Sequence, residues 1–193
     1  MYPTDKELIK RAKRRDKKAF SAIIDRYSDK IFGYLVRYVG DYQRAEDLTI
    51  ETFLNAYRRL RTYTEMGKLS SWLYKIATNC AKKEMRKNIR RREVSIEKPV
   101  DGEGSVNLQN FIADERSRPD YRARQAELKN LVYKAMTKLG EKYKKALLLC
   151  DVEGLAYGEA AKVLKSNPIT IGTRVRRARI MLYNVLRKYG YQF

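Results

Sequence analysis

The chain has 193 residues, with 43 lysines and arginines against 23 aspartates and glutamates, so its formal net charge is +20. This excess predicts a polyanionic partner and favours nucleic acid over a membrane, because no lipidation signal accompanies it. No apolar run approaches the roughly 18 residues of a membrane-spanning helix. Met1 leads into charged residues rather than into a signal peptide. We therefore expect a cytoplasmic protein with no membrane attachment of its own.

The charge is unevenly distributed along the chain. Residues 1–92 carry 24 basic and 11 acidic side chains, residues 93–121 carry 3 and 7, and residues 122–193 carry 16 and 5. Prolines and glycines interrupt the acidic stretch, which argues against a long helix there. The pattern predicts two basic domains, 1–92 and 122–193, joined by an extended acidic linker at 93–121.

Chemistry-bearing motifs are scarce. The chain has no histidine, and histidine is the commonest metal ligand and general base. Cys80 and Cys150 lie far apart in apolar helical patterns, which favours buried structural thiols over metal or redox roles. No phosphate-binding glycine loop or nucleophile elbow occurs. We expect no catalytic residues, no metal and no cofactor, and hence a protein that is not an enzyme.

The first domain is predicted to contain four helices. Thr4 and Asp16 are helix-capping residues that precede the first two. The third helix, 42–60, has an apolar stripe that includes Phe53 and Tyr57. Its outer face carries the acidic residues Glu46, Asp47 and Glu51. These acids either favour the helix N-terminus and pair with neighbouring cations, or present carboxylates to a basic protein partner.

The fourth helix is the most basic segment. From Ser70 to Arg92 it carries eight lysines and arginines against a single acid, Glu84. Ser70 and Ser71 are suitable helix caps, and the aromatic residues Tyr63, Trp72 and Tyr74 lie around its start. A solvated charged face is one interpretation. Cations beside aromatic rings also suit a nucleic-acid strand, because phosphates attract charge and unpaired bases stack on flat rings.

Within that cluster we expect Trp72 to lie in the core, because it continues the apolar face of the helix. Tyr63 and the loop 64–70 are then predicted to receive an unstacked base, with Asn79 and Lys82 beside them.

The second domain contains a helix-turn-helix pattern. A short helix, 155–165, precedes a turn at 166–168 and a long arginine-rich helix that runs to about residue 189. Ile171, Val175 and Leu182 are predicted to face inward. The alternative interpretation is a solvated basic face on a helical bundle. Arginine and threonine side chains bind guanine edges and phosphates. The outward residues are Thr170, Thr173, Arg174, Arg176, Arg177 and Arg179.

The order and spacing of three segments resemble the bacterial sigma factors of the extracytoplasmic-function (ECF) class, and the resemblance covers nearly the whole chain. The segments are RAEDLTIETFLNAYRRL (44–60), SWLYKIATN (71–79) and LGEKYKKALLLCDVEGLAYGEAAKVL…TIGTRVRRAR (139–179). The resemblance implies an all-α protein with a sigma region 2 domain and a sigma region 4 domain. It implies that the protein directs core RNA polymerase to promoters.

Site residues follow from this resemblance. The first segment implies binding to the largest subunit of core RNA polymerase through Glu46, Asp47, Glu51, Phe53 and Leu54. The second implies binding of the melted −10 element through Tyr63, Lys68, Ser70, Ser71, Trp72, Lys75, Asn79, Lys82, Lys83 and Arg86. The third implies that the outward residues of the last helix bind −35 duplex DNA. The implied partners are the two largest polymerase subunits, duplex and single-stranded promoter DNA, and an anti-sigma factor.

The chain departs from the family pattern at several positions. Gly140 replaces a common proline, and Ile50 a common glutamine. Lys165 stands where the family has a left-handed glycine, and Pro168 comes one residue late, which leaves the turn geometry open. Gly172 replaces a common polar or basic residue, so we expect −35 recognition to depend on Thr173, Arg176 and Arg177.

Two other classes stay open from the sequence. One is an independent helix-turn-helix regulator with no role as a polymerase subunit. The other, an RNA-modifying enzyme or nuclease, is disfavoured by the absence of a catalytic constellation.

Overall fold

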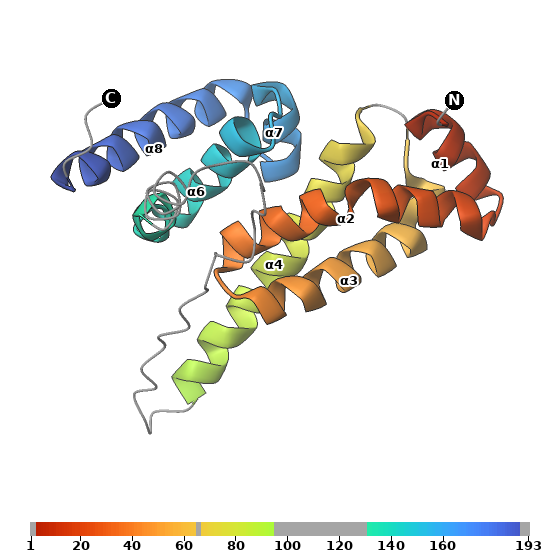
Figure 1. Ribbon diagram of the computed structural model, residues 1–193, viewed down its shortest axis with the longest axis horizontal. Helices are drawn as coiled ribbons and strands as arrows, with labels where there is room; N and C mark the ends of the chain where they lie inside the picture. Colours follow the sequence, from red (N-terminus) through yellow and green to blue (C-terminus); the bar gives the residue numbers. More distant parts are fainter. Residues whose placement is uncertain (1–2, 65–66, 95–130, 190–193) are drawn as a thin grey trace, which may run out of the picture.

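Every regular element in the computed structural model, which describes residues 3–64, 67–94 and 131–189, is helical (Figure 1). This confirms the expected all-α fold. Most of the predicted acidic linker lies outside the described residues, and its first two residues belong to the end of a helix. The N-terminal helices are α1 (Asp5–Lys13), α2 (Lys17–Val39), α3 (Tyr42–Arg59) with the short 3-10 turn η1 (Leu60–Thr62), and α4 (Leu69–Val94).

The predicted helix boundaries of the N-terminal half are largely confirmed. Thr4 and Glu7 form a reciprocal capping box at α1, and the Asp16 carboxylate accepts the amide proton of Ala19 at the start of α2. These contacts satisfy amide groups that have no partner within the helix. Gly40 ends α2 with a left-handed φ of 78°. The fourth helix begins at Leu69, so the predicted cap Ser70 lies in its first turn instead.

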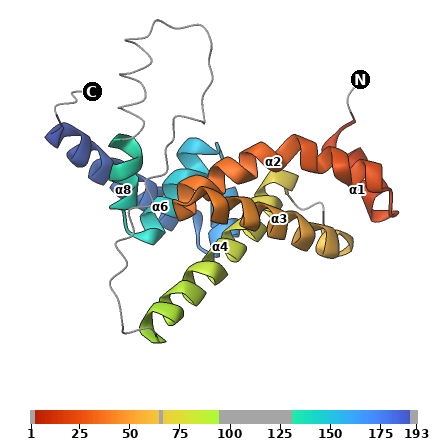
Figure 2. The ribbon, with the colours of Figure 1, turned by 60° about the horizontal axis from the view of Figure 1, so that its bottom comes forward.

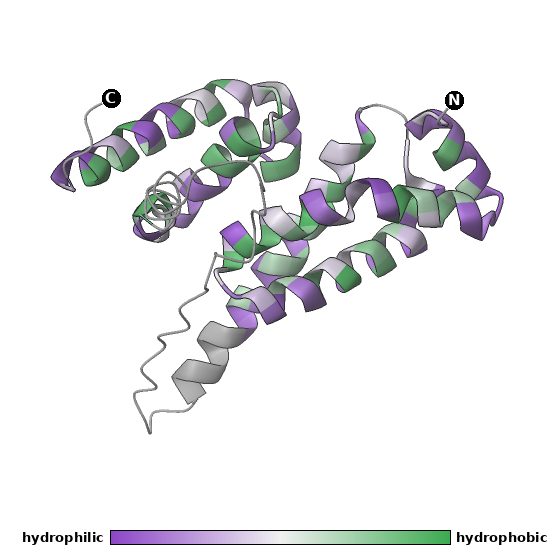
Figure 3. Ribbon diagram, in the orientation of Figure 1, coloured by the Kyte–Doolittle hydropathy of each residue, from purple (hydrophilic) through white to green (hydrophobic). Residues whose placement is uncertain are grey.

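The N-terminal core is formed where α2 packs against α1, α3 and α4. Apolar and polar residues alternate around each helix (Figure 3), as expected for helices with one buried face. Tyr34 is completely buried, and its hydroxyl lies 2.8 Å from that of Thr78 on α4, so its polar atom is satisfied. Tyr57, predicted to be buried, is 45% exposed. The core stripe of α3 is therefore narrower than its periodicity indicated.

The C-terminal half is a smaller helical unit. A helix over 131–137 precedes α6 (Glu141–Leu147), the π-helical turn η3 (Leu148–Val152), α7 (Tyr157–Leu164) and α8 (Pro168–Lys188). The side chains of Leu148, Ile171 and Val175 are fully buried and hold α8 against the others. The predicted helix-turn-helix corresponds to α7 and α8.

The turn between α7 and α8 keeps the left-handed geometry despite its unusual sequence. Lys165 adopts φ 51°, ψ 54°, the conformation that glycine would take at lower cost. Asn167 caps α8 by accepting the Thr170 amide proton at 2.7 Å, and Pro168 occupies the first turn of the helix. The Asn167 cap and Pro168 stabilise the start of α8, and this offsets part of the cost of a left-handed lysine at 165.

The two halves pack against each other. Helix α7 contacts α4, and η3 contacts α2. Figures 1 and 2 show the C-terminal helices beside one end of α2 and the upper part of α4. Polar groups join them: the Tyr38 hydroxyl donates to the Glu141 carboxylate at 2.8 Å, and Lys144 donates to the main-chain oxygen of Tyr38 at 2.9 Å. The structure is therefore a closed arrangement of the two basic units.

Candidate nucleic-acid and protein interfaces

The outer face of α3 combines acids with apolar side chains. Glu46 and Asp47 are exposed, and Glu51 is half-buried, with an oxygen 3.9 Å from the Lys83 ammonium. Leu54 is 52% exposed and suited to a protein partner. Phe53 is buried in the core, with 6% exposure, so its predicted contact with polymerase is wrong for this arrangement.

This face also carries an apolar residue that was not among the predicted contact residues. Ile50 is 58% exposed and lies one helical turn from Leu54, which in turn precedes the exposed Tyr57. The spacing of four and three places these side chains in one stripe. The sequence signal for this surface is a second apolar stripe, which is offset from the core stripe of the same helix. The α3 face, defined as Asp47, Ile50, Glu51, Leu54 and Tyr57, thus has an apolar centre and an acidic border.

Helix α4 presents the predicted row of cations. Lys75, Lys82, Lys83 and Arg86 are exposed, as is the amide side chain of Asn79. Two of these five, Asn79 and Lys82, lie in a cleft between α4 and the C-terminal helices. Lys68 also faces the other half, because its ammonium lies 3.2 Å from the Glu159 carboxylate on α7. Part of the basic face therefore borders the C-terminal half in the closed arrangement, although its side chains remain exposed.

The aromatic residues are arranged differently from the prediction. Tyr63 is only 5% exposed. Its hydroxyl donates to the Gly67 carbonyl oxygen at 2.8 Å, and its ring packs edge-on against Trp72 with centroids 5.0 Å apart. The Lys13 ammonium donates to the Tyr63 main-chain oxygen at 2.6 Å. The expectation that the Tyr63 ring is open to an unstacked base is thus wrong here, because the ring is buried against Trp72 in the first turn of α4.

The other aromatic residues occupy the core to different degrees. Trp72 is half-buried and packs against the core, so it is less buried than predicted. Tyr74 is 3% exposed, and its hydroxyl donates to Glu153 of the C-terminal half. Burial and the neighbouring carboxylate raise the pKa of Tyr74. Ser70 and Ser71 are both half-buried. Trp72 is thus more accessible than either tyrosine.

Helix α8 presents most of its predicted residues outward. Thr173, Arg176 and Arg177 are exposed, and Thr170 is half-buried. Arg179 donates two hydrogen bonds to Asp151, at 2.8 and 2.7 Å, and this partner raises the pKa of its guanidinium. Its predicted role in DNA contact competes with this bidentate pair inside the domain. Thr173, Arg176 and Arg177 define the exposed α8 face.

Other kinds of site are not formed by the residues that the structure describes. No three histidine, cysteine, aspartate or glutamate side chains there gather as metal ligands would. The described helices include none that is both long and apolar enough to cross a bilayer. Cys80 is buried and Cys150 half-buried, and neither forms a disulfide. Burial raises the pKa of both thiols, that of Cys150 to about 11, so both remain protonated at neutral pH.

Known proteins resemble the chain over most of its length. The Sigma-70 region 2 family matches residues 23–91, and the Sigma-70, region 4 family matches residues 129–182. The RNA polymerase sigma-H factor of Pseudomonas aeruginosa is 34% identical over 178 residues, which cover 91% of this chain and 90% of that protein. The ECF RNA polymerase sigma factor SigW of Bacillus subtilis is 31% identical over 182 residues, covering 94% and 96% of the two chains.

Solved structures share the fold. The sigma factor RpoE of Bartonella quintana, in a complex with the anti-sigma factor NepR, superposes with a TM-score of 0.72 at 22% identity, covering 88% of this chain and 98% of that one.

Two helical units, each with a basic helix exposed, define a protein that contacts DNA at two places. The family matches at both units, and the relatives that match over nearly the whole length, show to which family of DNA-binding proteins the chain belongs. The chain belongs to the ECF family of RNA polymerase sigma factors, and it directs RNA polymerase to promoters rather than acting as an independent regulator.

Proposed function

We propose that the two units divide promoter recognition between them. The domain at 1–92 binds core polymerase through the α3 face and the melted −10 strand through the cations of α4. The domain at 122–193 binds the −35 duplex through the α8 face, and the acidic linker at 93–121 connects the two. The observation that carries this proposal is the pair of basic helix faces, α4 and α8, on separate units, because two DNA elements a spacer apart need two tethered contacts.

On the α3 face, apolar Ile50 and Leu54 supply the buried centre of an interface, and Asp47 and Glu51 its charged border. Interfaces commonly have this anatomy. The carboxylates favour a basic partner surface on the polymerase, through its largest subunit, with the second-largest subunit also in contact with the sigma factor. The protein acts in the cytoplasm and has no catalytic activity of its own.

The −10 contact requires the closed arrangement to open. Lys68 is paired with Glu159, and Asn79 and Lys82 lie in the interdomain cleft. A strand that follows the α4 row therefore needs the C-terminal unit to move away. Trp72, half-buried beside Tyr63, is the most accessible aromatic ring for a base near this row.

An anti-sigma factor is a further expected partner. The neighbour RpoE was solved in a complex with the anti-sigma factor NepR, and CnrH, which superposes with a TM-score of 0.66 at 19% identity, with the cytosolic domain of CnrY. By analogy, we propose that an anti-sigma factor binds this chain and keeps it from polymerase.

Run-off transcription with core polymerase tests the division of roles. Three variants are compared. The α4 variant carries both Lys75→Ala and Lys82→Ala, and the α8 variant carries both Arg176→Ala and Arg177→Ala. The control variant carries Lys10→Ala at an exposed position of α1. The α4 variant should give little transcript from a duplex promoter, and its transcript yield should recover only partly when the −10 region is pre-melted. The α8 variant should lose dependence on the −35 sequence. Equal loss from all three variants would contradict the assignment of separate roles.

A further inference from the structure

We propose that the cleft between the two units binds a small phosphorylated anion and that this anion holds the closed arrangement together. The cleft has a volume of about 170 Å³, enough for a small phosphorylated molecule. Its wall is built from both units: Thr78, Asn79 and Lys82 come from α4, and the remainder from α6, α7, the following turn and α8. A ligand in it therefore contacts both units at once.

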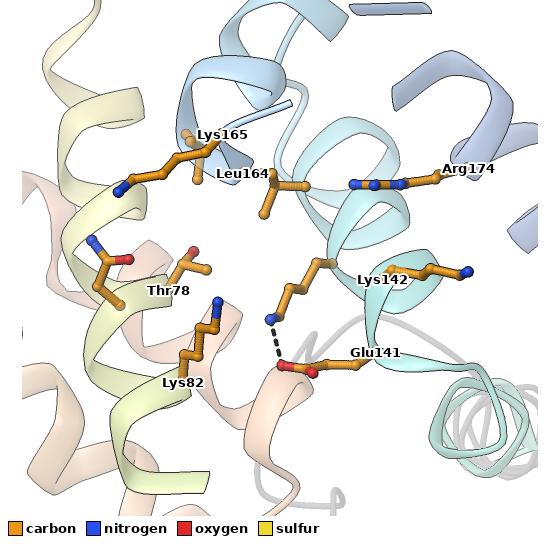
Figure 4. Close-up of a pocket in the computed structure, with 10 residues that line it drawn as sticks. Thr78, Lys82, Glu141, Lys142, Leu164, Lys165 and Arg174 are labelled. Carbon is orange, nitrogen blue, oxygen red and sulfur yellow. Dashed lines mark ion pairs between the residues drawn. The ribbon is translucent and has the colours of Figure 1, made fainter. Parts of the chain in front are cut away.

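Five cations line this cleft and a single carboxylate accompanies them. The cations are Lys82, Lys142, Lys145, Lys165 and Arg174, and the carboxylate is Glu141. Figure 4 shows Lys82 on α4 across the cleft from Glu141 on α6, while Lys165 extends from the end of α7 toward α4. The Lys142 side chain begins at the cleft wall, and its ammonium lies over the Tyr143 ring, 5.1 Å from the ring centroid. Like charges that face one another across a boundary oppose its closure, so an anion between them removes a repulsion.

The carboxylate already has its own partners. Glu141 pairs with Lys145, whose residue is only 9% exposed, and it accepts a hydrogen bond from the Tyr38 hydroxyl at 2.8 Å. In the described part of the chain no ion pair joins the other four cleft cations to a carboxylate. The cleft thus keeps an excess of positive charge that the protein itself does not neutralise.

The kind of donor indicates the kind of ligand. Four ammonium groups and one guanidinium supply only charged donors, and these form their strongest hydrogen bonds with multiply charged oxygen anions. Phosphoryl groups carry such oxygens on several sides, so they suit donors that converge from two units. A chain of phosphoryl groups, free or on a small molecule, fits this chemistry better than a carboxylate does.

The same arrangement couples the anion to DNA binding. Asn79 and Lys82 line the cleft and also belong to the row on α4 that is proposed above to bind DNA. An anion that binds only the closed form shifts the population toward it and away from the form that binds DNA. This consequence depends on the proposed function, whereas the binding site itself does not.

Calorimetric titration of the full chain with sodium tripolyphosphate tests the site. Salt at about 0.1 M screens exposed charges over about 10 Å and so reduces general attraction to the protein. The cleft variant combines Arg174→Gln with Lys165→Asn, because the Arg174 guanidinium points into the cleft and asparagine tolerates the left-handed backbone at 165. The matched control removes two exposed charges outside the cleft, Lys134→Gln with Lys162→Gln. We expect at least tenfold weaker binding for the cleft variant and less than twofold for the control.

A third variant separates the cleft from general electrostatics by the sign of its effect. Glu153→Lys adds positive charge but breaks polar contacts between the units. Affinity for tripolyphosphate should fall if the site needs both units and rise if the protein attracts anions only through its net charge. A rise in affinity, or equal losses in the cleft and control variants, would overturn the proposal.

An abasic DNA strand distinguishes a free anion from a DNA backbone, which carries the same phosphoryl chemistry. The proposal expects the cleft variant to lose tripolyphosphate binding more than abasic-strand binding. If the cleft variant loses only the abasic strand, the cleft belongs to the path of DNA and the proposal of a small ligand is wrong. Circular dichroism of each variant confirms that the helices are retained.

Discussion

Glu153 of the C-terminal unit accepts a hydrogen bond from the Tyr74 hydroxyl of α4, although the two residues are 79 positions apart in the sequence. The same carboxylate pairs with Arg37 on α2, and the Glu153 side chain is 6% exposed. One acid thus joins α2, α4 and the turn after η3. Because the carboxylate is mostly shielded from water, removing one partner would leave a buried charge uncompensated, which is strongly destabilising.

We expect Glu153→Lys to open the closed arrangement. The variant replaces an attraction to Arg37 with a repulsion, and the loss of such a pair costs about 2–5 kcal/mol. Small-angle X-ray scattering should show a larger radius of gyration, and binding to a single-stranded −10 oligonucleotide should tighten as α4 is uncovered. Asp25→Lys makes the same change in charge at an exposed position of α2 and should leave the radius unchanged. An equal effect of both variants would contradict a specific role of Glu153.

Closure should strengthen as the pH rises from about 8 to about 9. Burial lowers the pKa of Lys144 from 10.5 to about 8, and its ammonium donates to the Tyr38 carbonyl across the boundary. In this range the closed form binds fewer protons than an open form with an ordinary lysine, so raising the pH favours closure. Burial and a carboxylate partner raise the pKa values of Tyr38 and Tyr74 in the closed form, so above this range the ionisation of these tyrosines in the open form opposes closure. Scattering across this range should show compaction, and Lys144→Met should remove the dependence on pH.

The α3 face should control affinity for core polymerase. Asp47→Lys with Glu51→Lys should weaken binding by about 2–5 kcal/mol if these carboxylates pair across the interface. Fluorescence anisotropy with labelled protein measures this loss. Asp25→Lys with Asp29→Lys makes the same change in charge at exposed positions of α2 and should have little effect. Phe53→Ala should instead lower the free energy of unfolding by about 3–5 kcal/mol, because the ring is buried.

Recognition of the −35 element should depend on the exposed α8 face. Arg176→Ala and Arg177→Ala should each cost about 1–3 kcal/mol on the preferred duplex if they contact base edges. Arg187→Ala, exposed at the end of the same helix, is the control. Equal losses on specific and scrambled duplexes would show that the two arginines contact phosphate only. In that case the slope of log binding constant against log salt concentration would become shallower by about one for each arginine removed.

Gly172→Ala should stabilise the C-terminal unit by up to about 1 kcal/mol, because glycine is a poor residue in a helix interior. A methyl group there would meet the Tyr157 ring at 3.4 Å, an ordinary van der Waals contact. Thermal unfolding should therefore move to a higher temperature. A lower unfolding temperature would mean that close packing of α7 on α8 needs the glycine.

The positions of the helices could be predicted from the sequence alone. A buried stripe at a period of 3.6 and a capping residue at the helix start are local properties, so Thr4 and Asp16 indicated boundaries that the structure confirms. The fold class and the two basic helices followed from the same local signals. Family membership followed from the order of three segments along the chain.

Only the tertiary structure decided which side chains remain available to a partner. Phe53 and Leu54 are neighbours in one apolar pattern, yet one is buried and the other exposed, because α3 packs on α2 and α4 along a narrow stripe. Tyr63 is buried because its loop folds back onto α1 and Trp72. The contact between Glu153 and Tyr74 joins residues far apart in the chain, and no local periodicity encodes such a contact. It depends on how two independently patterned units meet in space.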